Sequence, residues 1–238
     1  MVIRELLSFN IKSVTGKLIV ANVIIYIIIS ISGGVLLAIL GEYLRAILSI
    51  LIPGSTGALT LFHELIFPVM LVPQDFTGGK YILFGLLKFD YPCVWELITS
   101  IFVHANIVHI GFNMLALQVL GSRFESILGS RRLLYTFFTG GIIANTATVA
   151  LSPPMIASVG ASGALFAVAG VIAIIEFRVF SSTQSLWWIL LILIISSLPL
   201  AGRVNMLAHI VGLSFGLLIG LYYSEILRRR LRRYYIRY

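Results

Sequence analysis

The stretch SVGASGALFAVAGVIAII, residues 158–175, contains no charged side chain in eighteen positions. A hydrophobic run of this length without charges is typical of a helix that crosses a lipid bilayer. Near its start, Ser162 lies between Gly160-Ala161 and Gly163, so a hydroxyl stands at the opening of an otherwise apolar segment. We therefore predict a transmembrane helix that begins with a polar motif.

Five further apolar runs extend this pattern along the chain, at residues 18–40, 98–120, 133–151, 186–200 and 204–227. The chain is 59% hydrophobic and 11% charged, with a mean hydropathy of +1.05, whereas a soluble domain carries about 25% charged residues. The sequence thus predicts an all-α polytopic membrane protein of the cell membrane, with one six-helix transmembrane bundle as its single domain, residues 1–238. No long internal repeat is visible, which disfavours an inverted-repeat transporter.

The distribution of basic residues predicts the orientation. With a cytoplasmic N-terminus, thirteen of the seventeen Lys and Arg residues fall on the cytoplasmic side, six of them in the tail 228–238. Cytoplasmic loops carry the excess of Lys and Arg in membrane proteins. We therefore expect both termini inside, with residues 1–17 and 228–238 as cytoplasmic segments. The net charge of +8 then indicates contact with anionic membrane lipids and not with nucleic acid.

The connection 41–96 is expected on the outer side, as a long loop between the first two helices. Its apolar pieces, residues 44–52 and 58–72, are interrupted by prolines and are each shorter than a span. Such pieces are expected to lie in the membrane interface or to dip into one leaflet. A seventh span through residues 59–72 is the alternative, and it would abolish the charge asymmetry.

The predicted orientation brings five polar side chains to one depth in the membrane. The spans 98–120, 158–175 and 204–227 all run inward, and close to their outer ends lie His104, His109, Asn113, Ser162 and His209. Ionisable groups inside a bilayer are costly and are functional-site candidates by default. The predicted orientation rests on Lys and Arg residues alone. The similar depth of these five side chains is therefore independent support for a shared site.

Small residues provide a reason for two of these side chains to meet. The span 204–227 carries Gly212, Gly216 and Gly220 at intervals of four, and the span 158–175 carries Gly163 and Gly170 among alanines. Small residues on one stripe allow two helix backbones to approach closely. Such stripes are common in general helix packing, but here they predict contact between the helices that bear Ser162 and His209.

These residue types together indicate serine hydrolysis. A serine becomes an effective nucleophile when a base such as His209 is within hydrogen-bond reach. His109 and Asn113, one turn apart, could bind an oxyanion together with free N–H groups at the start of the serine's helix. Each residue alone has a simpler interpretation: helix packing for Ser162, a structural or proton-relaying role for His209, and an interhelical hydrogen bond for Asn113. No acidic residue is placed to orient His209, so the combination predicts a dyad.

Metal and carboxylate chemistry find no support in the sequence. His63-Glu64 begins like a zinc-protease helix, but Phe67 occupies the position of the second histidine. The two aspartates, Asp75 and Asp90, both fall in the predicted outer loop, and the single Cys93 excludes an internal disulfide or a cysteine-based zinc site. We expect no metal and no cofactor.

The order of the motifs resembles that of the rhomboid family of intramembrane serine proteases, over roughly residues 95–218, about half the chain. The segments that carry the resemblance are His104-x4-His109-x3-Asn113, Gly160-Ala161-Ser162-Gly163 and Ala208-His209-x2-Gly212-x3-Gly216. Leu120-Gly121 followed by Glu125 also resembles the family's turn after the second helix. One departure is Trp95-Glu96, where the family commonly has Trp-Arg, so the usual anchoring of this loop is not carried over.

The resemblance implies a role for each matched residue. Ser162 would be the nucleophile and His209 the general base and later acid, while His109, Asn113 and the Ser162 backbone N–H would form the oxyanion hole. The supporting residues would be His104 beneath the first loop, Phe166 against the catalytic histidine, and the glycines Gly160, Gly163 and Gly212. The implied reaction is hydrolysis of a peptide bond in or beside the transmembrane helix of a membrane protein substrate. The substrate would enter sideways near the spans 98–120 and 186–200, and the short span 186–200 would be a mobile gate.

Two alternatives stay open at this point. One is a catalytically inactive rhomboid-like protein that binds and escorts transmembrane segments. The other is a transporter or channel in which His104 and His109 relay protons. Labelling by a serine-directed reagent separates the first from a protease, and a requirement for Ser162 separates the second.

Overall fold

The computed structural model describes residues 9–29, 81–83, 87–89, 94–152, 158–184, 186–187, 191 and 205–235. Apart from one short strand pair, the regular structure of these residues is helical. The elements in chain order are α2 (Val14–Ile29), β1 (Tyr81–Leu83), β2 (Leu87–Phe89), α5 (Glu96–Thr99), α6 (Ile107–Ala116), the π-helical segment η4 (Leu117–Gly121), α7 (Ser122–Leu128), α8 (Ser130–Leu151), α9 (Ser162–Phe180) and α11 (Met206–Tyr235).

Four helical segments among these residues are long and apolar enough to cross a membrane: Ile107–Leu128, Ser130–Leu151, Ser162–Phe180 and Met206–Arg232. They confirm four of the predicted spans, and the chain is a multi-pass integral membrane protein. Large apolar side chains on their outer surfaces, such as Ile107 and Leu218 with 72% and 66% exposed, suit contact with lipid. The shorter apolar helix α2 covers part of the predicted span 18–40, and nearly all of the predicted span 186–200 lies outside the described residues.

Both predicted ends of the second span were wrong. The helix begins at Ile107 and not at residue 98, because Asn106 has extended backbone and its side chain accepts the His109 N–H at 2.8 Å, which caps α6. The helix also continues through Leu120-Gly121, where we predicted a turn, since an isolated glycine inside a helix is tolerated. The chain reverses at Gly129, with φ of 86°, a backbone angle that favours glycine.

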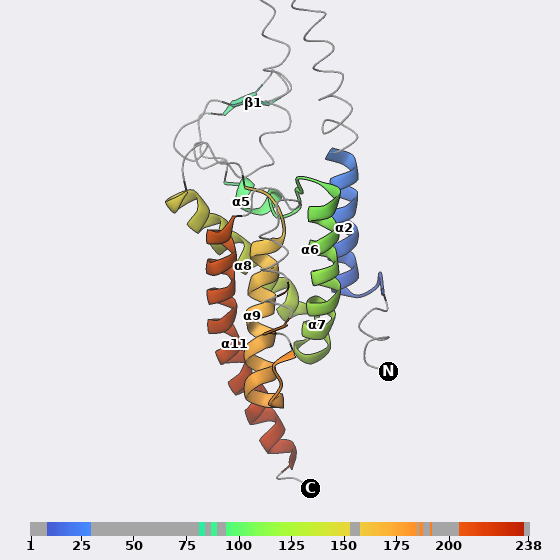
Figure 1. The fold of residues 1–238 in the computed structure, drawn as a ribbon, viewed down its shortest axis with the longest axis vertical. Coiled ribbons are helices and arrows are strands. Elements are labelled where there is room, and N and C mark those ends of the chain that lie inside the picture. Colours follow the sequence, from blue (N-terminus) through green and yellow to red (C-terminus); the bar gives the residue numbers. More distant parts are fainter. Residues whose placement is uncertain are drawn as a thin grey trace, which may run out of the picture.

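The other confirmed spans differ from the prediction at their ends. The helix α9 begins at Ser162 and not at residue 158, and it continues to Phe180. The helix α11 continues past residue 227 to Tyr235. At 1.5 Å per residue, its 30 residues exceed what the bilayer core requires by about ten residues. Figure 1 shows these last turns extending beyond the other helices.

The helix α9 lies at the centre of the bundle and packs against both α11 and α8; Figure 1 shows α11 on one side of it and α6 and α7 on the other. Its middle residues are fully enclosed, and Ala167, Val168, Ala169 and Val171 have no exposed surface. Their small and β-branched side chains let the neighbouring backbones come close. A helix whose middle is apolar on every side is expected to lie at the core of such a bundle.

The predicted outer loop 41–96 contains one described feature before α5. Strands β1 and β2 pair antiparallel, with Tyr81 opposite Phe89 and Leu83 opposite Leu87. The all-α prediction did not include this pair. Tyr81, Ile82 and Phe89 are of types that favour strands, but two runs of three residues are too short to stand out in a sequence dominated by transmembrane helices.

One carboxylate joins the first helix to the bundle at the end away from the predicted site. Glu125 accepts the backbone N–H groups of Val14 and Thr15 at 2.9 Å each, and the hydroxyls of Thr15 and Ser130 at 2.8 and 2.7 Å. The two N–H groups belong to the first turn of α2, where helical donors have no intrahelical acceptor. Glu125 therefore caps α2 from a position more than a hundred residues later in the chain.

Replacing Glu125 with Gln is expected to destabilise the protein by about 1.5–3 kcal/mol, because hydrogen bonds to a charged acceptor contribute about that much and the new amide NH₂ would face donors. Thermal unfolding in detergent measures the loss. The matched control is Glu225→Gln, whose carboxylate makes an exposed pair with Arg229 and should matter little. Equal losses in the two variants would contradict the capping role of Glu125.

Candidate active site

Ser162 and His209 are in direct contact. Ser162 is the first residue of α9, His209 lies in the first turn of α11, and the Ser162 Oγ is 2.8 Å from the His209 Nε2. His209 is 2% exposed. This distance is within hydrogen-bond range, so the predicted meeting of the two side chains occurs.

The glycine stripes produce this contact. A Cβ on Gly212 would overlap the carbonyl oxygen of Gly163, and a Cβ on Gly216 would overlap that of Ala167. One turn later, a Cβ on Gly220 would come within 2.9 Å of Ile174. Three successive turns of α11 thus lie directly on the backbone of α9, as small-residue stripes allow. The close approach begins next to Ser162 and His209 and extends toward the other end of the bundle.

Gly212→Ala is expected to force the two backbones apart and to reduce any activity that depends on the dyad by more than 10-fold, since a misplacement of about 1 Å can cost a hundredfold. Gly111→Ala is the control, because a Cβ there meets nothing within 4 Å. The rate at which a fluorophosphonate labels Ser162 measures the effect. A Gly212→Ala protein that is labelled as fast as Gly111→Ala would contradict the close-packing argument.

The segment before Ser162 passes over His109 and Asn113. Gly160 has φ of 116°, and a Cβ there would be 2.8 Å from the His109 Nε2 and 3.6 Å from the Asn113 Nδ2. Glycine is therefore required at this position by both backbone conformation and space. His109 and Asn113 lie one turn apart on α6, and the close approach puts a polar atom of each side chain beside the segment that leads into Ser162.

Two kinds of free donor face this region. The Asn113 Nδ2 is buried and finds no hydrogen-bond partner among the residues that the structure describes. Ala161 precedes α9 as its N-cap and provides no side-chain cap, so the first N–H groups of the helix remain available. Buried donors without a partner are rare, and the Asn113 Nδ2 lies close to Gly160, two residues before Ser162. That arrangement is suited to a negatively charged oxygen.

His104 lies in the connection between α5 and α6, with 5% of its surface exposed. Its Nδ1 donates to the Phe102 carbonyl at 3.2 Å, and its ring meets that of His109 edge-on at 5.1 Å between centroids. Burial, with a smaller contribution from His109, lowers the pKa of His104 to about 3. The imidazole is therefore neutral at physiological pH, and it contacts His109 and not the dyad.

Phe166 lies one turn after Ser162 and packs on the catalytic candidate His209. The two ring centroids are 4.4 Å apart, and the ring planes are inclined by 30°. The other ring nitrogen of His209, Nδ1, is buried without a hydrogen-bond partner among the described residues. In a catalytic triad, a carboxylate orients the histidine. Here the contact with the Phe166 ring restrains the His209 imidazole instead.

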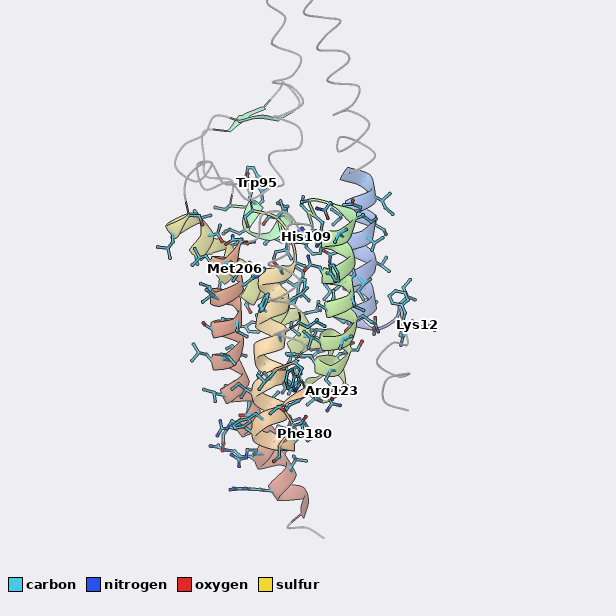
Figure 2. All side chains as sticks on the ribbon, viewed as in Figure 1. Lys12, Trp95, His109, Arg123, Phe180 and Met206 are labelled. Atoms are coloured by element: carbon cyan, nitrogen blue, oxygen red, sulfur yellow. The ribbon has the colours of Figure 1, made fainter. Side chains whose placement is uncertain are left out.

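All the predicted site residues thus lie at one end of the bundle. Figure 2 shows His109 and Met206, which begins α11, near this end, and Arg123 and Phe180 toward the other. At that other end, Arg123 pairs with Glu176 at 3.2 Å. No cluster of metal-ligating side chains occurs within the described part of the chain.

Sequence reasoning missed the buried polar residues that fix the site from α8. Asn145 donates to the Leu97 carbonyl at 2.9 Å and to the Ser100 hydroxyl at 3.0 Å, and the Ser100 carbonyl accepts the Gly160 N–H at 2.9 Å. This path connects α5 to the segment before Ser162. The one signal in the sequence was an asparagine inside an apolar span, which is costly without a partner. Asn205, which lies just before α11, was missed as well.

Comparison with known proteins identifies the family. A family model described as the Rhomboid domain matches residues 92–226, and the chain belongs to the rhomboid family. It is similar to YdcA of Bacillus subtilis, with 33% identity over 129 residues, 52% of this chain and 65% of that protein. The Rhomboid protease GluP of the same organism is 41% identical over 76 residues, 32% of this chain and 15% of that protein.

A third relative comes from a fungus. The Rhomboid-type serine protease 2 of Emericella nidulans is 28% identical over 156 residues, 63% of this chain and 30% of that protein. The chain therefore matches less than two thirds of the length of each of these relatives. Each alignment reflects a shared part of the relative and not its whole length.

Proposed function

We propose that this chain is an intramembrane serine endopeptidase that hydrolyses peptide bonds in or next to the transmembrane helices of membrane protein substrates, with Ser162 and His209 as a catalytic dyad. The observation that carries the proposal is the 2.8 Å contact between the Ser162 Oγ and the His209 Nε2, beside the uncapped start of α9. The names of two relatives, a rhomboid protease and a rhomboid-type serine protease, support the same activity.

In the proposed reaction, His209 takes the proton of Ser162 as its oxygen attacks the peptide carbonyl. The Ser162 N–H, Asn113 and His109 stabilise the oxyanion of the tetrahedral intermediate. His209 then gives the proton to the leaving amine, and water hydrolyses the acyl-enzyme with His209 again as base. No cofactor takes part, and a position at the end of the bundle suits the entry of water.

The substrate must present an extended peptide bond to this site. A helical peptide bond has its carbonyl already hydrogen-bonded, so a transmembrane substrate has to unwind locally before Ser162 can attack. Residues that weaken helices are therefore expected near the cut, with a small side chain just before it. The same proposal includes sideways entry of the substrate near the predicted spans 98–120 and 186–200.

A serine-directed fluorophosphonate tests the proposal. We expect the folded wild type to be labelled, Ser162→Ala to remain unlabelled, and the same pair to differ in cleavage of a reporter transmembrane substrate. A folded wild-type protein without labelling would favour an inactive, substrate-escorting protein. Cleavage that survives Ser162→Ala would refute the dyad.

We also propose that six helices cross the membrane with both termini in the cytoplasm, as one domain over residues 1–238, with the loop 41–96 outside. The single Cys93 is a native probe of this topology. In intact cells, a membrane-impermeant maleimide is expected to label Cys93, but not a cysteine placed at Tyr238 in a Cys93→Ser background until the cells are permeabilised. The reverse pattern would indicate an inverted topology.

A further inference from the structure

Asn205 uses all of its side-chain hydrogen-bonding groups where three elements meet. Its Nδ2 donates to the Thr148 Oγ1 and to the Ser158 Oγ, both at 2.8 Å, and its Oδ1 accepts the Ala208 N–H at 3.0 Å. Thr148 belongs to the last turn of α8, Ser158 leads into α9, and Ala208 lies in the first turn of α11. One amide therefore joins the two helices of the dyad to the third helix that packs on them.

Ser158 and Asn205 occupy equivalent positions before the two residues of the proposed dyad. Ser158 precedes Ser162 by four residues, and Asn205 precedes His209 by four residues. The hydrogen bond between Asn205 and Ser158 thus joins the two segments just before the nucleophile and the base. The 2.8 Å contact between Ser162 and His209 then lies between this hydrogen bond on one side and the contact of Gly212 with Gly163 on the other.

The two acceptors are fixed in place by burial. Thr148 has no exposed surface, and Ser158 is 8% exposed. The Thr148 hydroxyl donates to the Ala144 carbonyl at 3.0 Å, so its oxygen is oriented to accept from Asn205. A helix N-cap needs only the side-chain oxygen. The two Nδ2 contacts therefore exceed what capping requires.

We propose that Asn205 is a positioning residue, which keeps Ser162 and His209 at reacting distance by tying the start of α11 to Ser158 and Thr148. The inference rests on the proposed function. It assigns Asn205 no contact with substrate, because all three of its side-chain contacts are to protein groups.

The test separates capping from positioning. Asn205→Ser keeps a good N-cap but removes the amide donors. We expect kcat for cleavage of a reporter transmembrane substrate to fall about 10- to 100-fold with KM unchanged, as for a small misplacement of reacting groups. Fluorophosphonate labelling of Ser162 is expected to slow by the same factor. Ser158→Ala should have a smaller effect in the same direction, and combining the two should add little, since they break one interaction.

A second pair covers the case in which Asn205→Ser fails to fold. Thr148→Val removes the acceptor at nearly constant volume, and Thr148→Ser restores it. We expect fluorophosphonate to label Ser162 slowly in Thr148→Val and at close to the wild-type rate in Thr148→Ser. Glu125→Gln serves as the control for stability alone, because it weakens the opposite end of the bundle. At temperatures where it is folded, it should keep the wild-type kcat.

Wild-type labelling and kcat in folded Asn205→Ser and Thr148→Val would overturn the inference. So would a loss of kcat in Glu125→Gln as large as that in Asn205→Ser at an equal loss of thermal stability, because reduced stability alone would then explain the effect. The proposed function fails by a different result, namely cleavage that persists in Ser162→Ala or a folded wild type that is never labelled.

Discussion

Ser162→Ala and His209→Ala are each expected to lower kcat for cleavage of a transmembrane substrate by roughly 10⁴- to 10⁶-fold, and the double variant should lose no more than either single one. The reason is that the two side chains act as a unit. Without His209, the Ser162 hydroxyl keeps its proton and is a poor nucleophile. Without Ser162, the base has no group to activate. The 2.8 Å contact between them is the geometry that such a shared role requires.

Purified protein in detergent or bilayers, with a reporter transmembrane substrate, measures this loss. Ser214→Ala is the matched control, because Ser214 also belongs to α11 but is exposed, and its hydroxyl donates to the Ile210 carbonyl within the same helix. It should retain the wild-type rate. Independent, multiplying losses for Ser162→Ala and His209→Ala would contradict a dyad, as would cleavage that survives either substitution.

The transmembrane helices could be predicted from the sequence because the lipid bilayer restricts which structures can cross it. Inside a bilayer the backbone must satisfy its own hydrogen bonds, so long apolar runs become helices. That rule predicted the four membrane-crossing segments. Glycine spacing predicted that α9 and α11 touch, because an interval of four residues defines one face of a helix. The meeting of Ser162 with His209 followed from the two together.

What the sequence did not reveal depends on distant partners. Asn205 contacts residues 47 and 57 positions away, and Asn145 contacts residues 45 and 48 positions away. Nothing in the local pattern around an asparagine indicates which distant groups it will meet. The predicted span that contains α6 begins too early, at residue 98, although Asn106 itself is predicted as a loop or helix-end residue, and the structure places it at the helix end as the cap of α6. The capping of α2 by Glu125 likewise joins residues that only the folded bundle brings together.

Asn113→Ala is expected to lower kcat about 10²- to 10³-fold with little change in KM, because removing one donor from an oxyanion site has effects of that size. Asn113 is 6% exposed, and its Nδ2 has no hydrogen-bond partner among the described residues. A group held in this way contributes little to stability and is available only to a charge that develops during the reaction.

If Asn113 serves the oxyanion, its removal should lower kcat without lowering the stability of the protein. Truncating Asn113 removes a buried, unpaired donor, so the thermal stability of Asn113→Ala should equal or exceed that of the wild type even as kcat falls. Asn113→Asp should be at least as inactive, because an ionised carboxylate would repel the oxyanion. Asn106→Ser is the control on the same helix, since serine preserves the cap of α6, and it should keep the wild-type kcat. A fall in stability that matches the fall in kcat would instead indicate that Asn113 is an interhelical hydrogen-bonding residue, and the oxyanion would then depend on His109 and the first N–H groups of α9.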